Sequence, residues 1–189
     1  SYCKEKGITF LCTPWDTPSV DFLEQLGTSA YKIASGDMTN FPLIKYISKT
    51  KKPMIISTGM SKIEEIEKMV SFVKTLNTQF VLLHANSTYP SPIESLNVSL
   101  IPEYKKKFDV LIGFSDHETG IIGSLTAANM GAVIIERHIT LDKKMKGLDH
   151  SSSLEPNEFK ELVTMIRLSE KAKVKPLKKM TRAEVLQRE

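Results

Sequence analysis

The stretches VLIGFSDH, residues 110–117, and VIIERH, residues 133–138, decide how this chain folds. Each is a short apolar run that ends in charged or hydrogen-bonding side chains, which is typical of a strand buried in a parallel sheet. Four similar runs come earlier in the chain, at residues 8–12, 30–34, 53–57 and 80–84. The six runs start about 25 residues apart on average, with helical patterns between them. This spacing predicts a series of strand–helix units.

The segments between the runs carry signals for helix ends. We predict helix starts at residues that cap or open a first turn, and helix ends at glycines. The predicted helices are one capped by Ser19 that ends at Gly27, one behind a capping box at residues 61–64, one over 119–130 closed by Gly131, one over 156–172 opened by Pro156, and one that starts at 181–184. Strand–helix repetition of this regularity indicates either a (β/α)8 barrel or an open doubly wound sheet.

The position of the polar residues favours the barrel. No glycine-rich phosphate loop of the kind found in open nucleotide-binding sheets follows any of the runs. Polar residues instead follow the carboxyl end of every run, and in a barrel these ends converge on one mouth. A closed barrel has eight units, so we expect residues 1–174 to be a fragment that covers strands three to eight of a (β/α)8 TIM barrel, with two units missing upstream.

Composition and charge exclude several classes of protein. With 189 residues, 41% of them apolar, the chain is long enough for one globular domain. The formal net charge of +4 comes from residues 160–189, which carry nine basic and four acidic residues, so it does not indicate a nucleic-acid partner. No apolar stretch is long enough to span a membrane, and residues 1–6 lack the apolar region of a signal peptide, so we expect a cytoplasmic location.

Two histidines are the strongest candidates for chemistry. His117 and His138 follow consecutive strands, so a parallel barrel places them on neighbouring strands at one rim. Neutral imidazoles with open positions suit Mn, Fe, Co or Zn; the alternative is two unrelated loop histidines. Asp116 and Glu136 could orient these rings or act as acid or base. Because strand side chains alternate, Ser115 should share a face with His117, and Glu136 with His138.

A lysine inside an apolar run is the next candidate. Lys32 interrupts residues 30–34, and a buried ammonium is costly unless it is paired. Together with Ser35 and Ser57 it predicts a site for phosphate or carboxylate; the alternative is a lysine whose head reaches water. His84 lies within a run and is interpreted as a core histidine. On pattern alone, Asp149 belongs to a polar turn.

Seven motifs in this order make the chain resemble the sialic acid synthase family. They are TPWD at 13–16, YKIASGD at 31–37, ISTGM at 56–60, STYP at 87–90, GFSDHETG at 113–120, ERHITLD at 136–142 and GLDH at 147–150. The resemblance implies an enzyme that condenses phosphoenolpyruvate with N-acetylmannosamine or its 6-phosphate. Residues 136–156 look most like the animal enzymes, which use the phosphorylated sugar.

The resemblance also implies roles for individual residues. A divalent metal, usually Mn²⁺ with Mg²⁺ or Co²⁺ as alternatives, would be held by His117 and His138. The residues expected to bind phosphoenolpyruvate are Lys32, Ser35 and Ser57, with Thr13 and Ser115 nearby. Tyr89, Glu136 and Asp149 match positions that contact the sugar or the reacting centre, and Glu136 is the candidate for proton transfer. Ser87 is the candidate for a further contact with the sugar, at a position where some bacterial members have asparagine.

Further parts of the family's architecture are implied outside this chain. Residues 175–189 resemble a basic linker toward a C-terminal antifreeze-like domain, which completes the partner's site in a swapped homodimer. The chain alone is therefore expected to be inactive. Two alternatives stay open: a synthase for a related sugar acid, such as pseudaminic or legionaminic acid or the product of a pentose phosphate, and a catalytically inactive fragment that serves as a binding module.

Overall fold

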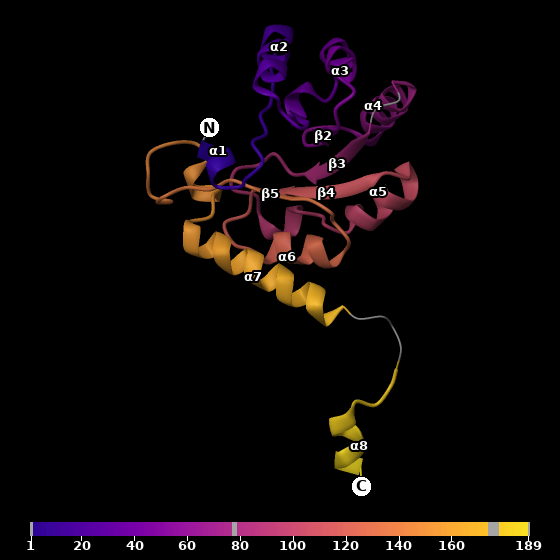
Figure 1. Cartoon of the computed structure of the whole chain (residues 1–189), viewed down its shortest axis with the longest axis vertical. Coiled ribbons are helices and arrows are strands. Elements are labelled where there is room, and N and C mark those ends of the chain that lie inside the picture. Colours follow the sequence, from indigo (N-terminus) through magenta and orange to yellow (C-terminus); the bar gives the residue numbers. More distant parts are fainter. Residues whose placement is uncertain (1, 77–78, 174–177, 189) are drawn as a thin grey trace.

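The computed structural model describes residues 2–76, 79–173 and 178–188, and it consists of one parallel sheet flanked by helices (Figure 1). The strands within these ranges are β1 (Tyr31–Ile33), β2 (Met54–Ser57), β3 (Phe80–Ala85), β4 (Leu111–Asp116) and β5 (Ile135–Arg137). They pair in the order β1-β2-β3-β4-β5, and every pair is parallel. An order without a reversal is the arrangement of a barrel wall, whereas a doubly wound sheet changes direction at a switch point.

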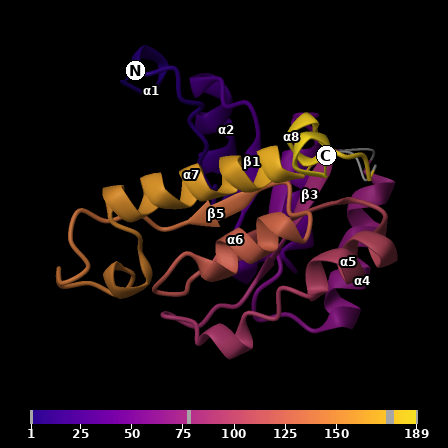
Figure 2. The ribbon, with the colours of Figure 1, turned by 90° about the horizontal axis from the view of Figure 1, so that it is seen from below.

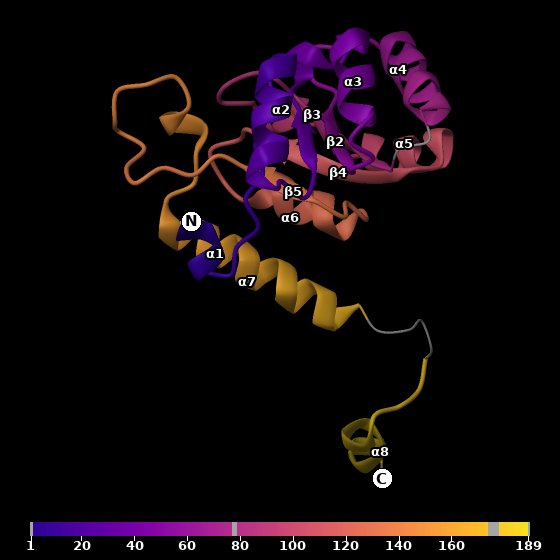
Figure 3. The ribbon, with the colours of Figure 1, turned by 45° about the horizontal axis from the view of Figure 1, so that its top comes forward.

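Helices connect and cover the strands. The α-helices are α1 (Tyr2–Glu5), α2 (Thr17–Leu26), α3 (Phe41–Ser48), α4 (Ile63–Thr75), α5 (Leu100–Phe108), α6 (Ile122–Asn129), α7 (Pro156–Ala172) and α8 (Arg182–Arg188). Short 3-10 turns are η1 (Ser35–Asp37), η2 (Ile93–Ser95) and η3 (His150–Ser152). Helices α2, α3 and α4 lie along one flank of the sheet (Figure 3), and α6 and α7 pack on each other beside β5 (Figure 2).

The distance within one ion pair shows that the sheet is strongly curled. Neighbouring strands lie about 4.8 Å apart, so the first and fifth strands of a flat sheet would be separated by about 19 Å. Nevertheless, Lys32 Nζ on β1 lies 3.6 Å from Glu136 Oε2 on β5. The side chains meet across the concave face because the five strands form a curled half-barrel. The predicted partial (β/α)8 barrel is therefore confirmed.

The convex face of the sheet holds the main hydrophobic core. Side chains that alternate with Lys32 and Glu136 along the strands point toward the helices and are almost completely buried. They include Tyr31, Ile33, Met54, Ile56, Leu82, Ile112 and Phe114. The predicted apolar stripe of α4 packs on this core through Ile66, Met69, Val70 and Val73. The alternation gives each strand one face for packing and one face for the barrel interior.

One predicted strand is wrong. Residues 8–12 lie outside the sheet in an irregular segment, and Ile8 and Phe10 are 65% and 48% exposed. Strand β1 pairs with β2 on one side, and no described residue pairs with its other side. An apolar, β-branched run forms a strand only when a neighbour supplies the hydrogen bonds of a ladder. The described half-barrel therefore has five strands and not six.

Some helix starts differ from the predicted ones. Asp16 caps α2 by accepting a hydrogen bond from the Ser19 backbone at 2.8 Å, so Ser19 lies inside the first turn. At α4 the backbone N–H of Lys62 donates to Glu65 Oε2 at 2.8 Å, so the N-cap is Lys62, one residue later than predicted, and its side chain does not complete a capping box. Helix α6 starts at Ile122, three residues after the predicted start, because residues 118–121 form the loop that follows β4.

Other helix signals are confirmed. Gly27 ends α2 with a φ of 74°, and Gly131 follows α6 with a φ of 99°, both in the left-handed region that favours glycine. Helix α7 begins at Pro156 and ends at Ala172. Thr181 and Glu184 exchange hydrogen bonds at the start of α8. Within the described ranges, no helix has the length and apolarity needed to cross a bilayer.

Candidate active site

Four polar side chains meet on the concave face of the sheet, each from a different strand. Lys32 Nζ donates to Ser57 Oγ at 2.7 Å and lies 3.6 Å from Glu136 Oε2. Ser115 Oγ donates to Glu136 Oε1 at 2.7 Å. The strand register explains the last contact, because Ser115 and Glu136 are directly paired across β4 and β5. We call Lys32, Ser57, Ser115 and Glu136 the inner cluster.

The inner cluster holds its charges in a partly dry environment. The Lys32 side chain is 15% exposed and the Glu136 side chain 39%. Burial lowers the pKa of Lys32, and the nearby Glu136 carboxylate acts in the opposite direction. An ammonium held this way binds an anion strongly, because its field is weakly screened and little of its hydration remains to be lost. The geometry suits an anion that bears several oxygens.

A second group of serines surrounds a glycine after β2. The backbone N–H of Gly59 donates to Ser35 Oγ at 3.0 Å. A Cβ atom at Gly59 would lie 2.2 Å from Ser87 Oγ and 2.8 Å from Ser35 Oγ, so no larger residue fits without movement. The loop after β2 therefore comes into close contact with η1 and with the segment after β3. Ser35 and Ser87, predicted separately, lie in one corner.

The two candidate metal ligands lie close together beyond the ends of β4 and β5. The ring centroids of His117 and His138 are 5.3 Å apart. Tyr89 contacts both, with its ring centroid 4.2 Å from that of His117 and 5.7 Å from that of His138. Asp149 Oδ2 lies 3.9 Å from His138 Nδ1. We call His117, His138, Tyr89 and Asp149 the rim cluster; it adjoins the inner cluster along both strands.

The protonation of His117 suits a metal ligand. Its Nδ1 lies 2.7 Å from the backbone oxygen of Asn86, and since a carbonyl only accepts, Nδ1 carries the hydrogen. The lone pair therefore lies on Nε2. Burial lowers the pKa of His117, which favours the neutral ring that a divalent cation requires. These donors fit a metal with open positions, although the described residues contain no group of three or more His, Cys, Asp or Glu arranged as ligands.

The structure contradicts the role expected of Asp116, while that of Thr13 toward a bound substrate stays a prediction. Asp116 does not orient an imidazole: strand alternation turns its side chain to the convex face, where it pairs with Arg137 at 2.6 Å. Thr13 lies in the irregular segment before α2, and among the described residues no hydrogen bond joins its side chain to either cluster. His84 is 7% exposed and its Nε2 contacts the backbone oxygen of Leu96 at 2.8 Å, which confirms a core histidine.

Sequence reasoning missed two contributors. The backbone carbonyl of Asn86 sets the tautomer of His117. Every residue has a backbone carbonyl, so the residue type at this position does not predict the contact. Gly59 allows the close contact of Ser35 and Ser87. Its position in a small-residue loop directly after a strand is the signal that could have identified it.

A curled parallel sheet with an ammonium, a carboxylate and two imidazoles at the carboxyl ends of its strands defines a partial (β/α)8 barrel with a polar site at its mouth. The chain belongs to the NeuB family, whose model matches residues 1–178. It is 44% identical to human N-acetylneuraminate-9-phosphate synthase over 97% of its own length and 52% of that protein. Identity is 42% to the N,N'-diacetyllegionaminic acid synthase of Campylobacter jejuni, over 97% of this chain and 56% of that one.

A solved structure agrees with this assignment. The crystal structure of N-acetylneuraminic acid synthetase from Leptospira borgpetersenii in complex with citrate matches with a TM-score of 0.89 and 35% identity, over 97% of this chain and 65% of that one. The predicted resemblance to the sialic acid synthase family is confirmed. The chain spans about half the length of the curated relatives it matches.

Proposed function

We propose that this chain supplies the phosphoenolpyruvate and metal sites of a synthase that joins phosphoenolpyruvate to N-acetylmannosamine 6-phosphate. The products are N-acetylneuraminate 9-phosphate and phosphate. The inner cluster carries the proposal, because Lys32, Ser57, Ser115 and Glu136 are joined at one point beside His117 and His138. The name of the human relative favours the phosphorylated sugar over free N-acetylmannosamine.

In this proposal the lysine and the serines hold phosphoenolpyruvate. Lys32 compensates the phosphate charge, and Ser57 and Ser35 donate hydrogen bonds to its oxygens. Ser115 lies near the reacting end, because it already donates to Glu136. Thr13 and Ser87 complete the expected set of substrate-binding residues. Fixed donors in a partly dry site stabilise charge without the cost of reorganising water.

The rim cluster accepts the sugar and the metal. His117 and His138 would hold a divalent cation, with Mn²⁺ proposed over Mg²⁺ and Co²⁺, and when bound it supplies a Lewis acid for the aldehyde oxygen of the open-chain sugar. Burial and the charges of Asp149 and Glu136 raise the pKa of Tyr89, so its phenol stays a hydrogen-bond donor toward the sugar. Asp149 accepts hydrogen bonds from the sugar hydroxyls.

Glu136 performs the proton transfer in this scheme. The methylene carbon of phosphoenolpyruvate bonds to the aldehyde carbon, which leaves positive charge on the former enol carbon. Water adds there and gives its proton to Glu136, whose carboxylate is partly exposed and held by Ser115. The bond from this carbon to the phosphate oxygen then breaks, phosphate leaves with the proton of the newly added hydroxyl, and a ketone remains. Glu136 passes its proton to the former aldehyde oxygen, which becomes a hydroxyl. Atoms balance with one water consumed.

The remaining parts of the proposal concern the whole protein. Residues 175–189 are proposed as a linker to a C-terminal antifreeze-like domain, although residues 175–177 and 189 lie outside the described ranges. The whole protein is proposed to be a cytoplasmic homodimer, and the described half-barrel alone to be inactive. Neither nucleic acid nor a membrane is proposed as a partner.

Phosphate release tests the function. Full-length protein is incubated with Mn²⁺, phosphoenolpyruvate and either N-acetylmannosamine 6-phosphate or N-acetylmannosamine. We expect release with the 6-phosphate. The His138→Ala variant is expected to lose turnover while keeping its circular dichroism spectrum. His84→Gln, on the convex face of β3, is the matched histidine control and should remain active. Retained activity of His138→Ala would contradict its role as a ligand.

A second candidate changes only the sugar. The 42% identity to the legionaminic acid synthase favours a diacetylated amino sugar as the alternative acceptor, and pseudaminic acid synthesis belongs to the same class. A third assay arm with that sugar separates the two functions. If phosphate is released with none of these sugars, a catalytically inactive binding module is the remaining hypothesis.

A further inference from the structure

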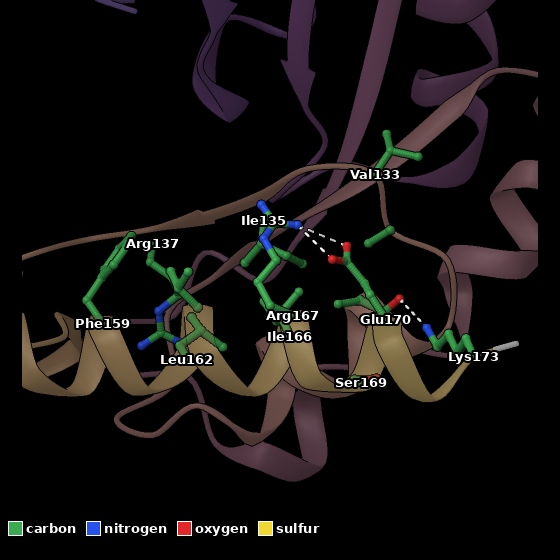
Figure 4. A pocket seen from close by; sticks show the side chains of 13 residues that line it. Val133, Ile135, Arg137, Phe159, Leu162, Ile166, Arg167, Ser169, Glu170 and Lys173 are labelled. Carbon is green, nitrogen blue, oxygen red and sulfur yellow. Dashed lines mark hydrogen bonds and ion pairs between the residues drawn. The ribbon is translucent and has the colours of Figure 1, made fainter. Parts of the chain in front are cut away.

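A completely buried ion pair joins β4 and β5 on the convex face, behind the site. Arg137 Nη1 lies 2.6 Å from Asp116 Oδ2, and both side chains are 0% exposed. Figure 4 shows Arg137 between the ribbon of β5 and side chains of α7, such as Phe159 and Leu162. The pair therefore lies in the layer between sheet and helices, where neither side chain reaches the substrate.

Arg137 connects four separate segments of the chain. Besides Asp116 on β4, it donates to the Glu118 backbone oxygen in the following loop at 2.6 Å. Longer contacts of 3.4 Å reach Ser124 Oγ on α6 and the Ser152 backbone oxygen in η3. Asp116 in turn accepts from the Glu118 backbone at 3.0 Å and from Ser124 Oγ at 2.5 Å. The network therefore connects β5 to the end of β4, to the loop that follows β4, to α6 and to η3.

This pair has a high energetic cost. Two charges lose their hydration, and an apolar pair of similar volume is often as stable or more stable. The Nε atom of Arg137 is also buried and has no hydrogen-bond partner. Stability alone is therefore a poor reason for an ion pair at this position, and a positioning role is a better one.

The register relates the pair to the site. Asp116 is paired with Arg137 across the two strands, and Ser115 with Glu136. Each member of the ion pair thus stands between two site residues of its own strand: Asp116 between Ser115 and His117, Arg137 between Glu136 and His138. A slip of one residue would turn all of these side chains to the wrong face.

We propose that Asp116 and Arg137 are positioning residues, whose buried pair holds the strand ends in the register that brings His117 and His138 together. This inference deepens the proposed function and rests on it. The pair contacts neither substrate nor metal; it acts through the backbone of β4 and β5. Its specific contribution is the set of bonds from Arg137 to Glu118 and Ser152, which no apolar side chain reproduces.

The test separates positioning from stability. Mn²⁺ affinity is measured by calorimetry on full-length wild type, on Arg137→Lys and on the double variant Asp116→Leu/Arg137→Met. The double variant fills the space without the charges but leaves the Glu118 backbone and the Ser124 hydroxyl without these partners, so its thermal stability should fall, and by less than that of Arg137→Met. The Mn²⁺ affinity of the double variant should fall by about tenfold or more. Val73→Ala, which opens a cavity in remote α4, is the control for stability loss and should bind Mn²⁺ as wild type does.

Each outcome decides something. A double variant that is stable and binds Mn²⁺ as tightly as wild type overturns the positioning role. If the double variant does not fold, Arg137→Lys decides: it keeps the charge, and unchanged affinity would contradict the proposal. If wild type binds no Mn²⁺, the proposed metal site fails. The positioning role is then tested separately by the nuclear Overhauser contacts between the rings of Tyr89 and His117, which should disappear in the variants and persist in Val73→Ala.

Discussion

The two faces of the same sheet carry two ion pairs that behave differently. On the concave face Lys32 and Glu136 are 3.6 Å apart and their side chains are 15% and 39% exposed. On the convex face Arg137 and Asp116 are 2.6 Å apart and completely buried. The inner pair keeps access to water, so each partner can exchange the other for a ligand. The outer pair has no such exchange available. Burial and the number of partners thus separate a binding pair from a positioning pair of the same chemistry.

The largest expected effect comes from breaking the outer pair on one side. Arg137→Met leaves Asp116 charged and unpaired in the layer between sheet and helices. We expect the free energy of unfolding to fall by about 3–5 kcal/mol, as measured by urea denaturation. A loss below about 1 kcal/mol would show that the outer pair is as replaceable as a surface ion pair.

The same change on the inner face should affect function and leave stability nearly unchanged. Lys32→Met removes the ammonium but leaves Glu136 partly hydrated. We expect kcat/KM for phosphoenolpyruvate to fall by about 10²–10³-fold. The free energy of unfolding should change by less than about 1 kcal/mol. If instead Lys32→Met unfolds the protein and the folded fraction remains active, the roles assigned to the two faces are reversed.

Packing beneath the site gives the next prediction. A Cβ at Gly113 would lie 2.4 Å from Leu83 Cδ2 and 2.7 Å from the Ile134 backbone oxygen, whereas a Cβ at Gly36 meets nothing within 4 Å. Gly113→Ala should therefore destabilise the protein by about 1–3 kcal/mol. The control Gly36→Ala should stay within about 0.5 kcal/mol of wild type in the same thermal or urea experiment. Equal effects would mean that the concave face tolerates added volume.

The smallest effect concerns pH. Burial lowers the pKa of His84, so the folded protein keeps this ring neutral at pH values where the unfolded chain takes up a proton. The neutral His84 ring contributes to the free energy of unfolding. This contribution is fully present at pH values above the pKa of histidine in the unfolded chain, about 6.5, and it is lost as pH falls toward the lower pKa of His84 in the folded protein. We expect the free energy of unfolding to fall from pH 7 to pH 5, and less steeply in His84→Gln. If the free energy of unfolding falls equally steeply with pH in wild type and in His84→Gln, His84 is not the cause of the pH dependence.

The fold can be predicted from local sequence patterns, and the predictions are wrong where a segment's structure depends on whether another segment lies beside it. Runs of β-branched residues identify all five strands, yet residues 8–12 have the same composition and form no strand. Composition describes how well a segment suits a sheet, and it does not say whether a strand lies beside it. The capping residues shift for a related reason: Asp16 and Ser19 are both good caps, and the path of the chain selects one of them.

Much of the candidate site was also within reach of the sequence. Alternation predicts that Ser115 shares a face with His117 and Glu136 with His138, because it depends only on strand period. The contact between Ser115 and Glu136 depends in addition on the register of β4 against β5. The contact of Lys32 with Glu136 was not predictable, since it depends on the curl of the whole sheet.

The role of Arg137 was not predicted, although the sequence contains a pattern that indicates it. Arg137 follows Glu136 directly and Asp116 follows Ser115 directly, so alternation places both on the opposite, buried face of the sheet. Two opposite charges on a buried face indicate an ion pair.

The contact that spans the half-barrel also has a place in the order of assembly. Lys32 and Glu136 are 104 residues apart in the chain, and three strands lie between β1 and β5 in the sheet. Because closing so long a loop is costly, we expect this contact to form only after the intervening strands have paired. Weakening it should therefore leave the folding rate nearly unchanged and appear as faster unfolding, so kinetics would identify it as one of the last interactions to form.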